Sequence, residues 1–139
     1  MSYTENFSET HYPLIEVAPA TYNAGIAVVS AYADMENYHR AVAVVHIGTV
    51  AQGGSVTVIL NEATTAAGAS AGALHTVVYT AAGVYAIEVQ SELFTPGHKF
   101  IAVSYDVNAA AVTFSIILYG IITRYAPVPT TNWAGIHGP

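Results

Sequence analysis

The chain has 139 residues, a formal net charge of −6, 53% hydrophobic residues and 9% charged residues. Soluble domains usually carry roughly 25% charged residues, so this composition predicts an exterior that neighbouring subunits cover. The alternative is an uncharged, alanine-rich monomer. Without cysteine, the chain excludes disulfides, thiolate nucleophiles and cysteine-based zinc sites. Its three basic residues are scattered, which excludes nucleic acid as a partner because phosphates are bound by clustered cations.

Residues 1–22 are predicted to form an N-terminal arm that packs on a neighbouring subunit, or a frayed end. Pro13 and Pro19 interrupt this segment, and proline cannot supply the N–H of a sheet ladder, so any strand here should be short or at an edge. The first residues lack the basic and apolar regions of a secretory signal. The most apolar run, residues 114–122, is shorter than the roughly 20 residues of a membrane-spanning helix, so no membrane partner is expected.

Two runs, residues 40–47 and 55–60, are predicted to pair as a central β-hairpin. Both runs are rich in valine, isoleucine and alanine, and the glycines between them, Gly48, Gly53 and Gly54, favour a tight connection. Along the first run both alternating faces are largely apolar, a pattern that is typical of a strand covered on two sides.

The segments on either side of this hairpin are expected to continue the sheet structure. Residues 25–32 form a predicted strand, and residues 63–73 form a surface loop in which a short helical turn remains possible. Residues 74–80 and 84–91 are predicted to pair as a second hairpin. In its second arm Tyr85, Ile87 and Val89 should face one way, and Glu88 and Gln90 should face solvent.

Two more strands are predicted before the C-terminal tail, over residues 99–107 and 110–123. The second is long for a strand, so Gly120 is expected to mark a bulge or a bend. The tail, residues 124–139, contains three prolines and cannot be a central strand.

Seven or eight short strands with no helical periodicity predict an all-β fold, an antiparallel β-sandwich of the jelly-roll or immunoglobulin-like kind over residues 23–123. The extended segments 1–22 and 124–139 would be arms at its two ends. A closed barrel is the alternative. Because cysteine is absent, an immunoglobulin label would describe architecture alone.

No catalytic motif stands out in the chain, so no enzymatic activity, cofactor or metal is predicted. The six histidines are scattered, and His39 and His46 would lie on opposite faces of one strand, so they cannot share a metal ion. Glu62 and Glu88 could converge as the paired carboxylates of a glycosidase, but solvated carboxylates are the simpler interpretation. The ten tyrosines could bind a glycan, although in a sandwich they more often span core and rim.

One pattern of residues resembles a known group of proteins. It consists of Asp34-Met35 with Tyr38-His39 nearby, an apolar strand closing on Gly48, a glycine-containing turn, and a valine- and threonine-rich strand ending in Asn61-Glu62-Ala63. The later strand from Lys99 to Val107, then Val112 to Gly120 and the exit Tyr125-Ala126-Pro127, fits the same pattern. Over residues 25–128 the chain resembles small virion proteins of tailed bacteriophages encoded near the major capsid gene.

This resemblance implies a β-sandwich virion protein, a decoration or cement protein made in the host cytoplasm and bound to the outer surface of an icosahedral capsid. The major capsid protein would be its partner, and a homotrimer on a local three-fold axis is the expected oligomer. Alternatives are a tail or head-to-tail joining component and a glycan- or receptor-binding module. Aromatic and apolar residues of the two arms are the expected contacts with other subunits: Tyr3, Phe7, Tyr12, Leu14, Tyr125, Trp133 and Ile136.

Overall fold

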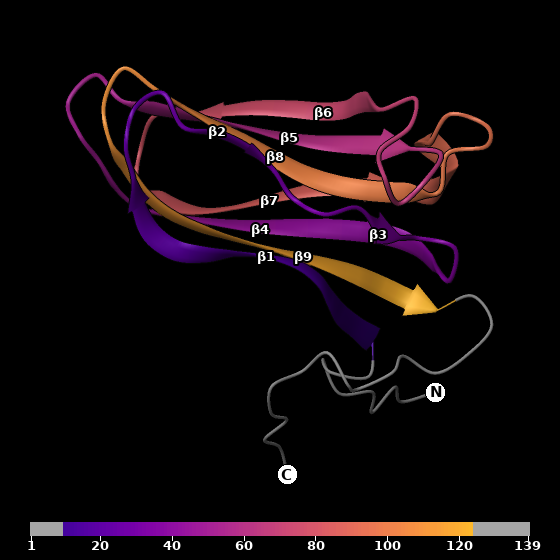
Figure 1. The fold of residues 1–139 in the computed structure, drawn as a ribbon. Coiled ribbons are helices and arrows are strands. Elements are labelled where there is room, and N and C mark those ends of the chain that lie inside the picture. Colours follow the sequence, from indigo (N-terminus) through magenta and orange to yellow (C-terminus); the bar gives the residue numbers. More distant parts are fainter. Residues whose placement is uncertain (1–9, 124–139) are drawn as a thin grey trace, which may run out of the picture.

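The computed structural model describes residues 10–123, which form two antiparallel sheets packed face to face (Figure 1). Sheet A contains, in spatial order, β1 (His11–Tyr22), β9 (Val112–Thr123), β4 (Tyr38–Val50) and β7 (Gly83–Gln90). Sheet B contains β2 (Ala27–Val29), β8 (Phe100–Asn108), β5 (Ser55–Ala63) and β6 (Gly72–Tyr79), and the short β3 (Ala33–Asp34) also pairs with β8. A 3₁₀ turn, η1 (Ser91–Leu93), lies between β7 and β8.

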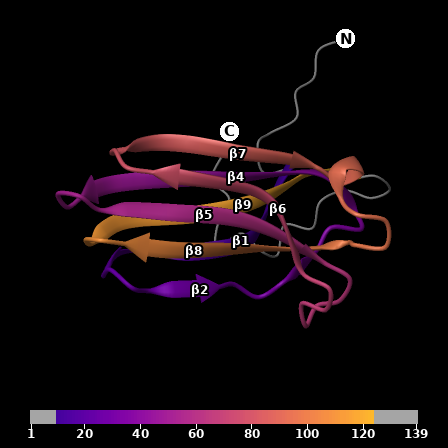
Figure 2. The same ribbon diagram turned by 90° about the horizontal axis from the view of Figure 1, so that it is seen from above.

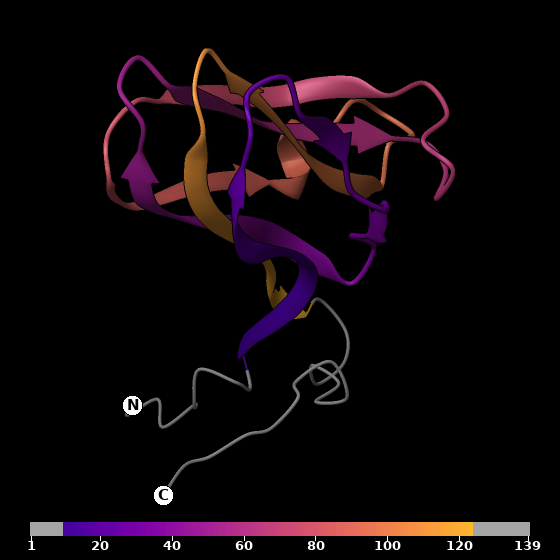
Figure 3. The ribbon, with the colours of Figure 1, turned by 60° about the vertical axis from the view of Figure 1, so that its left-hand side comes forward.

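The strand order identifies this sandwich as a jelly roll. The orders β1-β9-β4-β7 and β2-β8-β5-β6 arise because the chain repeatedly crosses from one sheet to the other, as Figure 3 shows. This confirms the all-β antiparallel sandwich and selects the jelly roll from the two architectures expected from the sequence.

The two hairpins predicted from the sequence are wrong, although their strands exist. β4 lies in sheet A and β5 in sheet B, and likewise β7 lies in sheet A and β6 in sheet B. The short connections 51–54 and 80–82 therefore bridge the gap of about 10 Å between stacked sheets rather than a pair of neighbouring strands. The hairpin of this region is β5 with β6, joined by the predicted surface loop at 64–71.

The core lies between the sheets and follows the period-two alternation of the strands. Along β4, the inward positions Ala41, Ala43, Val45 and Ile47 are buried, and on β5 Val56, Val58 and Leu60 oppose them from the other sheet. The outward side of β4 is not buried among residues 10–123. The sequence predicted that both faces of this strand are covered. Residues 10–123 cover its inward face and leave its outward face partly exposed.

The segment predicted as an N-terminal arm, residues 1–22, differs from that prediction over residues 11–22. They form β1, a 12-residue strand that pairs with β9 at the edge of sheet A. The edge position agrees with the prolines, and register shifts occur between Pro13 and Ile15 and between Val17 and Ala20. The sandwich thus begins at residue 11 rather than 23, while the tail predicted over 124–139 lies outside the described residues.

Gly120 has a different role from the predicted bulge or bend. Its pairings with Tyr12 and Ala41 carry no register shift. A Cβ atom at this position would lie 2.8 Å from ring atoms of Tyr38 and 3.0 Å from a methyl carbon of Leu14. Glycine is needed because the Tyr38 ring lies directly on the β9 backbone, where it stacks on Tyr12 at 5.9 Å between centroids.

We expect the free energy of unfolding to fall as the pH rises from about 10 to 12. Burial, with Tyr12 as a second cause, raises the pKa of the Tyr38 phenol from 10.0 to about 12. Between these values the unfolded chain loses the phenol proton while the folded chain keeps it, which favours unfolding by about 1–2 kcal/mol. Urea unfolding at several pH values should show a shallower decline for Tyr38→Phe. An equally steep decline in that variant would contradict the assignment.

Part of this alkaline decline should persist in Tyr38→Phe. Burial also raises the pKa values of Tyr79, Tyr105 and Tyr119. These phenols act in the same direction, so the difference between the two pH profiles, rather than the whole decline, reports on Tyr38.

Candidate functional site

The outward surface of sheet A is apolar across three adjacent strands. Pairing places Val44 between Ala86 on β7 and Ile117 on β9, and the next row places Val42 between Glu88 and Tyr119. Val84 of β7, one row further along, is 69% exposed, and its row continues with the polar residues His46 on β4 and Ser115 on β9. We call the following residues the apolar patch: Val42, Val44, Val84, Ala86, Ile117 and Tyr119.

The two charged residues on the outward side of β4 and β7 neutralise each other. Arg40 Nε lies 2.9 Å from Glu88 Oε1, and both side chains are about half exposed. An exposed pair of this kind contributes roughly 0–1 kcal/mol to stability. The pair therefore adds no net charge to the border of the apolar patch.

Sheet B presents a more polar outward surface. Thr57 pairs with Asp106 there, and the Asn61 side-chain amide donates a hydrogen bond to Ser104 Oγ at 2.9 Å. The segment before β3 also attaches to this sheet, because the Val103 N–H donates to Ser30 Oγ at 3.0 Å. Sheet B also carries exposed valines, Val28 and Val29 on β2 and Val78 on β6, but these lie on its two edge strands. The apolar residues of sheet A are instead contiguous across β7, β4 and β9.

Two of the predicted contact residues, Tyr12 and Leu14, lie in β1 and pack against the core of their own chain. Tyr12 stacks on Tyr38, and Leu14 lies beside Gly120. These two residues therefore lie in a strand of the sandwich rather than in an arm, and their contact with other subunits stays a prediction. The other five predicted contacts lie outside the described residues: Tyr3, Phe7, Tyr125, Trp133 and Ile136.

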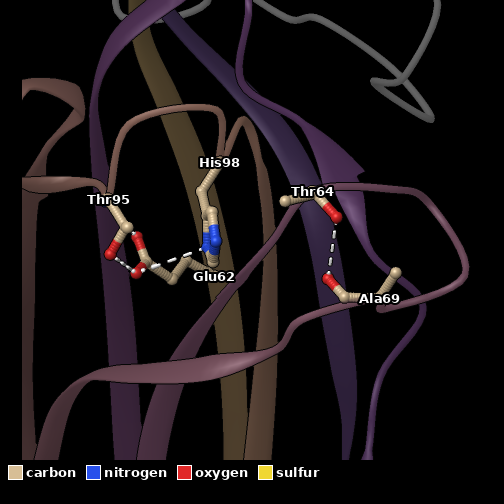
Figure 4. Close-up of polar contacts among 5 residues, drawn as sticks. All are labelled: Glu62, Thr64, Ala69, Thr95 and His98. Atoms are coloured by element: carbon tan, nitrogen blue, oxygen red, sulfur yellow. Dashed lines mark hydrogen bonds and ion pairs between the residues drawn. The ribbon is translucent and has the colours of Figure 1, made fainter.

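A buried polar cluster lies at the end of β5, formed by Glu62, Thr95 and His98 (Figure 4). The Glu62 carboxylate is 6% exposed and accepts a hydrogen bond from the Thr95 N–H at 2.8 Å and a short one from the Thr95 hydroxyl. His98 Nδ1 lies 3.4 Å from Glu62 Oε1, and there is no hydrogen bond between these two atoms. The cluster fastens the loop between η1 and β8 to sheet B.

The surroundings of this cluster favour a structural role. A hollow of about 210 Å³ beside His98 is lined by Met35, Phe94 and Ser91 and bordered by the Glu36 and Lys99 side chains, whose charged atoms are 3.6 Å apart. Glu62 uses both carboxylate oxygens within the protein. Residues 10–123 contain no group of three side chains that could hold a metal ion.

The carboxylates considered as a glycosidase pair do not converge. Glu62 is buried between the sheets at the end of β5, whereas Glu88 projects outward from β7 and pairs with Arg40. The interpretation of both as solvated is correct for Glu88 and wrong for Glu62. A sequence signal for Glu62 did exist, because it continues the inward series Val56, Val58 and Leu60 at period two.

Comparisons with known proteins show a likeness of fold. No family model matches the chain, and no curated protein matches it. A solved structure described as Bacillus endospore appendages, which form a novel family of disulfide-linked pili, is similar over 88% of this chain and 97% of its own, with 17% sequence identity and a TM-score of 0.47. A likeness of this size carries no conclusion about function. Within residues 10–123, no helix has the length and hydrophobicity to cross a bilayer.

Proposed function

We propose that the protein is a structural virion protein, a decoration or cement protein that binds the outside of an icosahedral phage capsid through the apolar patch of sheet A. The observation that carries the proposal is this partly exposed apolar patch, with the Arg40–Glu88 pair at its border, on a chain with 9% charged residues. Contiguous apolar patches on a protein surface mark interaction sites when polar residues rim them.

The patch is suited to a rigid contact. β4 is a central strand, paired with β7 on one side and with β9 on the other, and its inward side chains are fully buried. Val42 and Val44 are therefore held on a preorganised surface, so little conformational entropy is lost when a partner covers them. A partner that covers the patch would meet the Arg40–Glu88 pair on one side and the Glu16 side chain of β1, opposite Ile117, on the other, so it would need a polar group at Glu16.

Binding to the assembled shell stabilises that shell by linkage. A protein that binds assembled capsid more tightly than free capsid subunits shifts the equilibrium towards the assembled state. Three copies around a local three-fold axis would match the symmetry of the shell, so the proposal places this trimer on the capsid and not in free solution. The terminal segments 1–9 and 124–139 add aromatic residues that could extend the contact.

The proposal is tested by placing one charge in the apolar patch. Val44→Lys should weaken binding to capsids that lack the protein by at least about tenfold, because the interface would bury an unpaired ammonium group. Co-sedimentation of the purified protein with such capsids measures the affinity. Binding to isolated tails instead of heads would indicate a tail or joining component.

The matched control is Thr57→Lys, which adds the same side chain to the outward surface of sheet B. Both variants should fold, since both positions point away from the core, and circular dichroism would verify this. Thr57→Lys should keep the wild-type affinity. Equal losses in the two variants, or no binding by the wild-type protein to heads or tails, would contradict the proposal.

A further inference from the structure

The jelly roll has edge strands that differ in their protection against pairing with another chain. β1 contains Pro13 and Pro19 and two register shifts, and β2 has three residues. β6 has a register shift opposite Leu60 and Asn61. Prolines, irregular pairing and short length all prevent an edge from accepting a further strand.

β7 lacks these protections. Its eight residues pair with β4 from Arg40 opposite Gln90 to Ile47 opposite Gly83 without a register shift. It contains no proline, and it is the last strand in the order of sheet A, so no strand among residues 10–123 pairs with its other side. Figure 2 shows β7 along one edge of the sandwich. The charge of its one ionic residue, Glu88, is neutralised by Arg40 from the same sheet.

We propose that β7 is a pairing edge for a second copy of this chain, with the two β7 strands antiparallel about a two-fold axis at Ala86. This inference does not depend on the proposed function. Antiparallel pairing keeps the inward faces together only when residues of the same parity oppose each other. With Ala86 opposite Ala86 of the partner copy, Val84 lies opposite Glu88 and Tyr85 lies opposite Ile87.

Repulsion between the two copies of Glu88 favours the register with Ala86 at the axis over the register with Ile87 at the axis. With Ala86 at the axis, the two copies of Glu88 are offset by four residues, about 13 Å along the strands. With Ile87 at the axis the offset falls to two residues, about 7 Å, which is within the screening length at physiological salt. The Ala86 register therefore separates the like charges, and it places the smallest side chain of the outward row, Ala86, at the centre.

The pairing would join two four-stranded sheets into one continuous eight-stranded sheet. Val84 and Ala86 belong to the apolar patch, so the patches of the two copies would become contiguous on one surface. A two-fold contact is self-complementary and closes after two copies, which satisfies the open edge without producing a filament. The contact leaves the outward side of β4 and β9 available for other partners.

A single cysteine tests the register, because the chain has no cysteine of its own. Ala86→Cys places the two thiols at the axis, within the Cα separation of 4.4–6.8 Å that a disulfide requires. Under mild oxidation this variant should form a covalent dimer of twice the 14.5 kDa chain mass on a non-reducing gel. Val84→Cys, whose copies would be about 13 Å apart, should crosslink at least about tenfold more slowly.

A charge tests the edge itself. Val84→Glu should halve the particle mass measured by light scattering, because in the proposed register the new carboxylate lies opposite Glu88 of the partner copy, and like charges directly opposite destabilise a strand pair. Val78→Glu on β6, where the native valine is 56% exposed, should leave the mass unchanged. Equal crosslinking of the two cysteine variants, or loss of mass in Val78→Glu but not in Val84→Glu, would overturn the proposal. A wild-type protein that stays monomeric at high concentration would also overturn it.

Discussion

Phe114→Ala is expected to lower the free energy of unfolding by about 3–5 kcal/mol, a large part of the stability of a single domain. Phe114 is 1% exposed and lies on β9 in sheet A, opposite Ile47 and Ala20 in the neighbouring strands. Its ring contacts Tyr22, with centroids 4.5 Å apart, and Tyr105 of sheet B, at 5.2 Å. Truncation would leave a cavity between the sheets that the rigid strands cannot close.

The matched control for this prediction is Phe100→Ala on β8. Phe100 is partly exposed, and pairs with Asp34 and Ala63 at one end of sheet B. Its loss should cost no more than about 1.5 kcal/mol, because solvent already reaches the ring. Urea unfolding followed by circular dichroism compares the two. Similar losses in both variants would mean that Phe114 does not hold the sheets together.

Glu62→Ala is expected to lower the free energy of unfolding by about 2–3 kcal/mol. The substitution removes the acceptor of the Thr95 N–H and of the Thr95 hydroxyl, and both groups lie in a partly buried site. The loop would remain attached at Lys99, whose N–H donates to the Ala63 carbonyl at 3.1 Å. Hydrogen exchange should therefore increase first in residues 94–98, before the core strands are affected.

Two conservative variants separate the hydrogen bonds from the packing of this cluster. Glu62→Gln keeps an acceptor oxygen and should cost about 1 kcal/mol, less than the alanine variant. Thr95→Val removes the hydroxyl but keeps the shape and the backbone N–H, so it should also fall between wild type and Glu62→Ala. If Glu62→Ala unfolds at the same urea concentration as the wild type, the cluster does not stabilise the loop.

The sequence predicted the positions of individual strands more reliably than it predicted which strands pair with one another. The alternation in β7, with Tyr85, Ile87 and Val89 inward and Glu88 and Gln90 outward, is confirmed. The predicted strand over 110–123 corresponds to β9, and the loop before β6 is where the low-complexity segment predicted it. These features depend on residues close together in the chain, where period-two hydrophobicity and turn residues act directly.

The candidate site could be predicted from the sequence only in part. The sequence shows apolar residues on both faces of β4, but the patch also requires Ala86 of β7 and Ile117 of β9 to lie on either side of Val44. The prolines of β1 favour an arm when the sequence is taken alone, although an edge strand tolerates them. The buried role of Glu62 depends on Thr95, which is 33 residues away in the chain.

The amino-acid sequence by itself determined that this chain forms β-strands, roughly where each lies, and that its exterior has few charges. The tertiary structure alone decided that β4 and β5 face each other across the core instead of pairing side by side, and that no strand among residues 10–123 pairs with the outer side of β7. The physical reason is that a strand with one apolar face gains the same burial from either arrangement. Long-range packing of the two whole sheets, rather than local preference, selects between them.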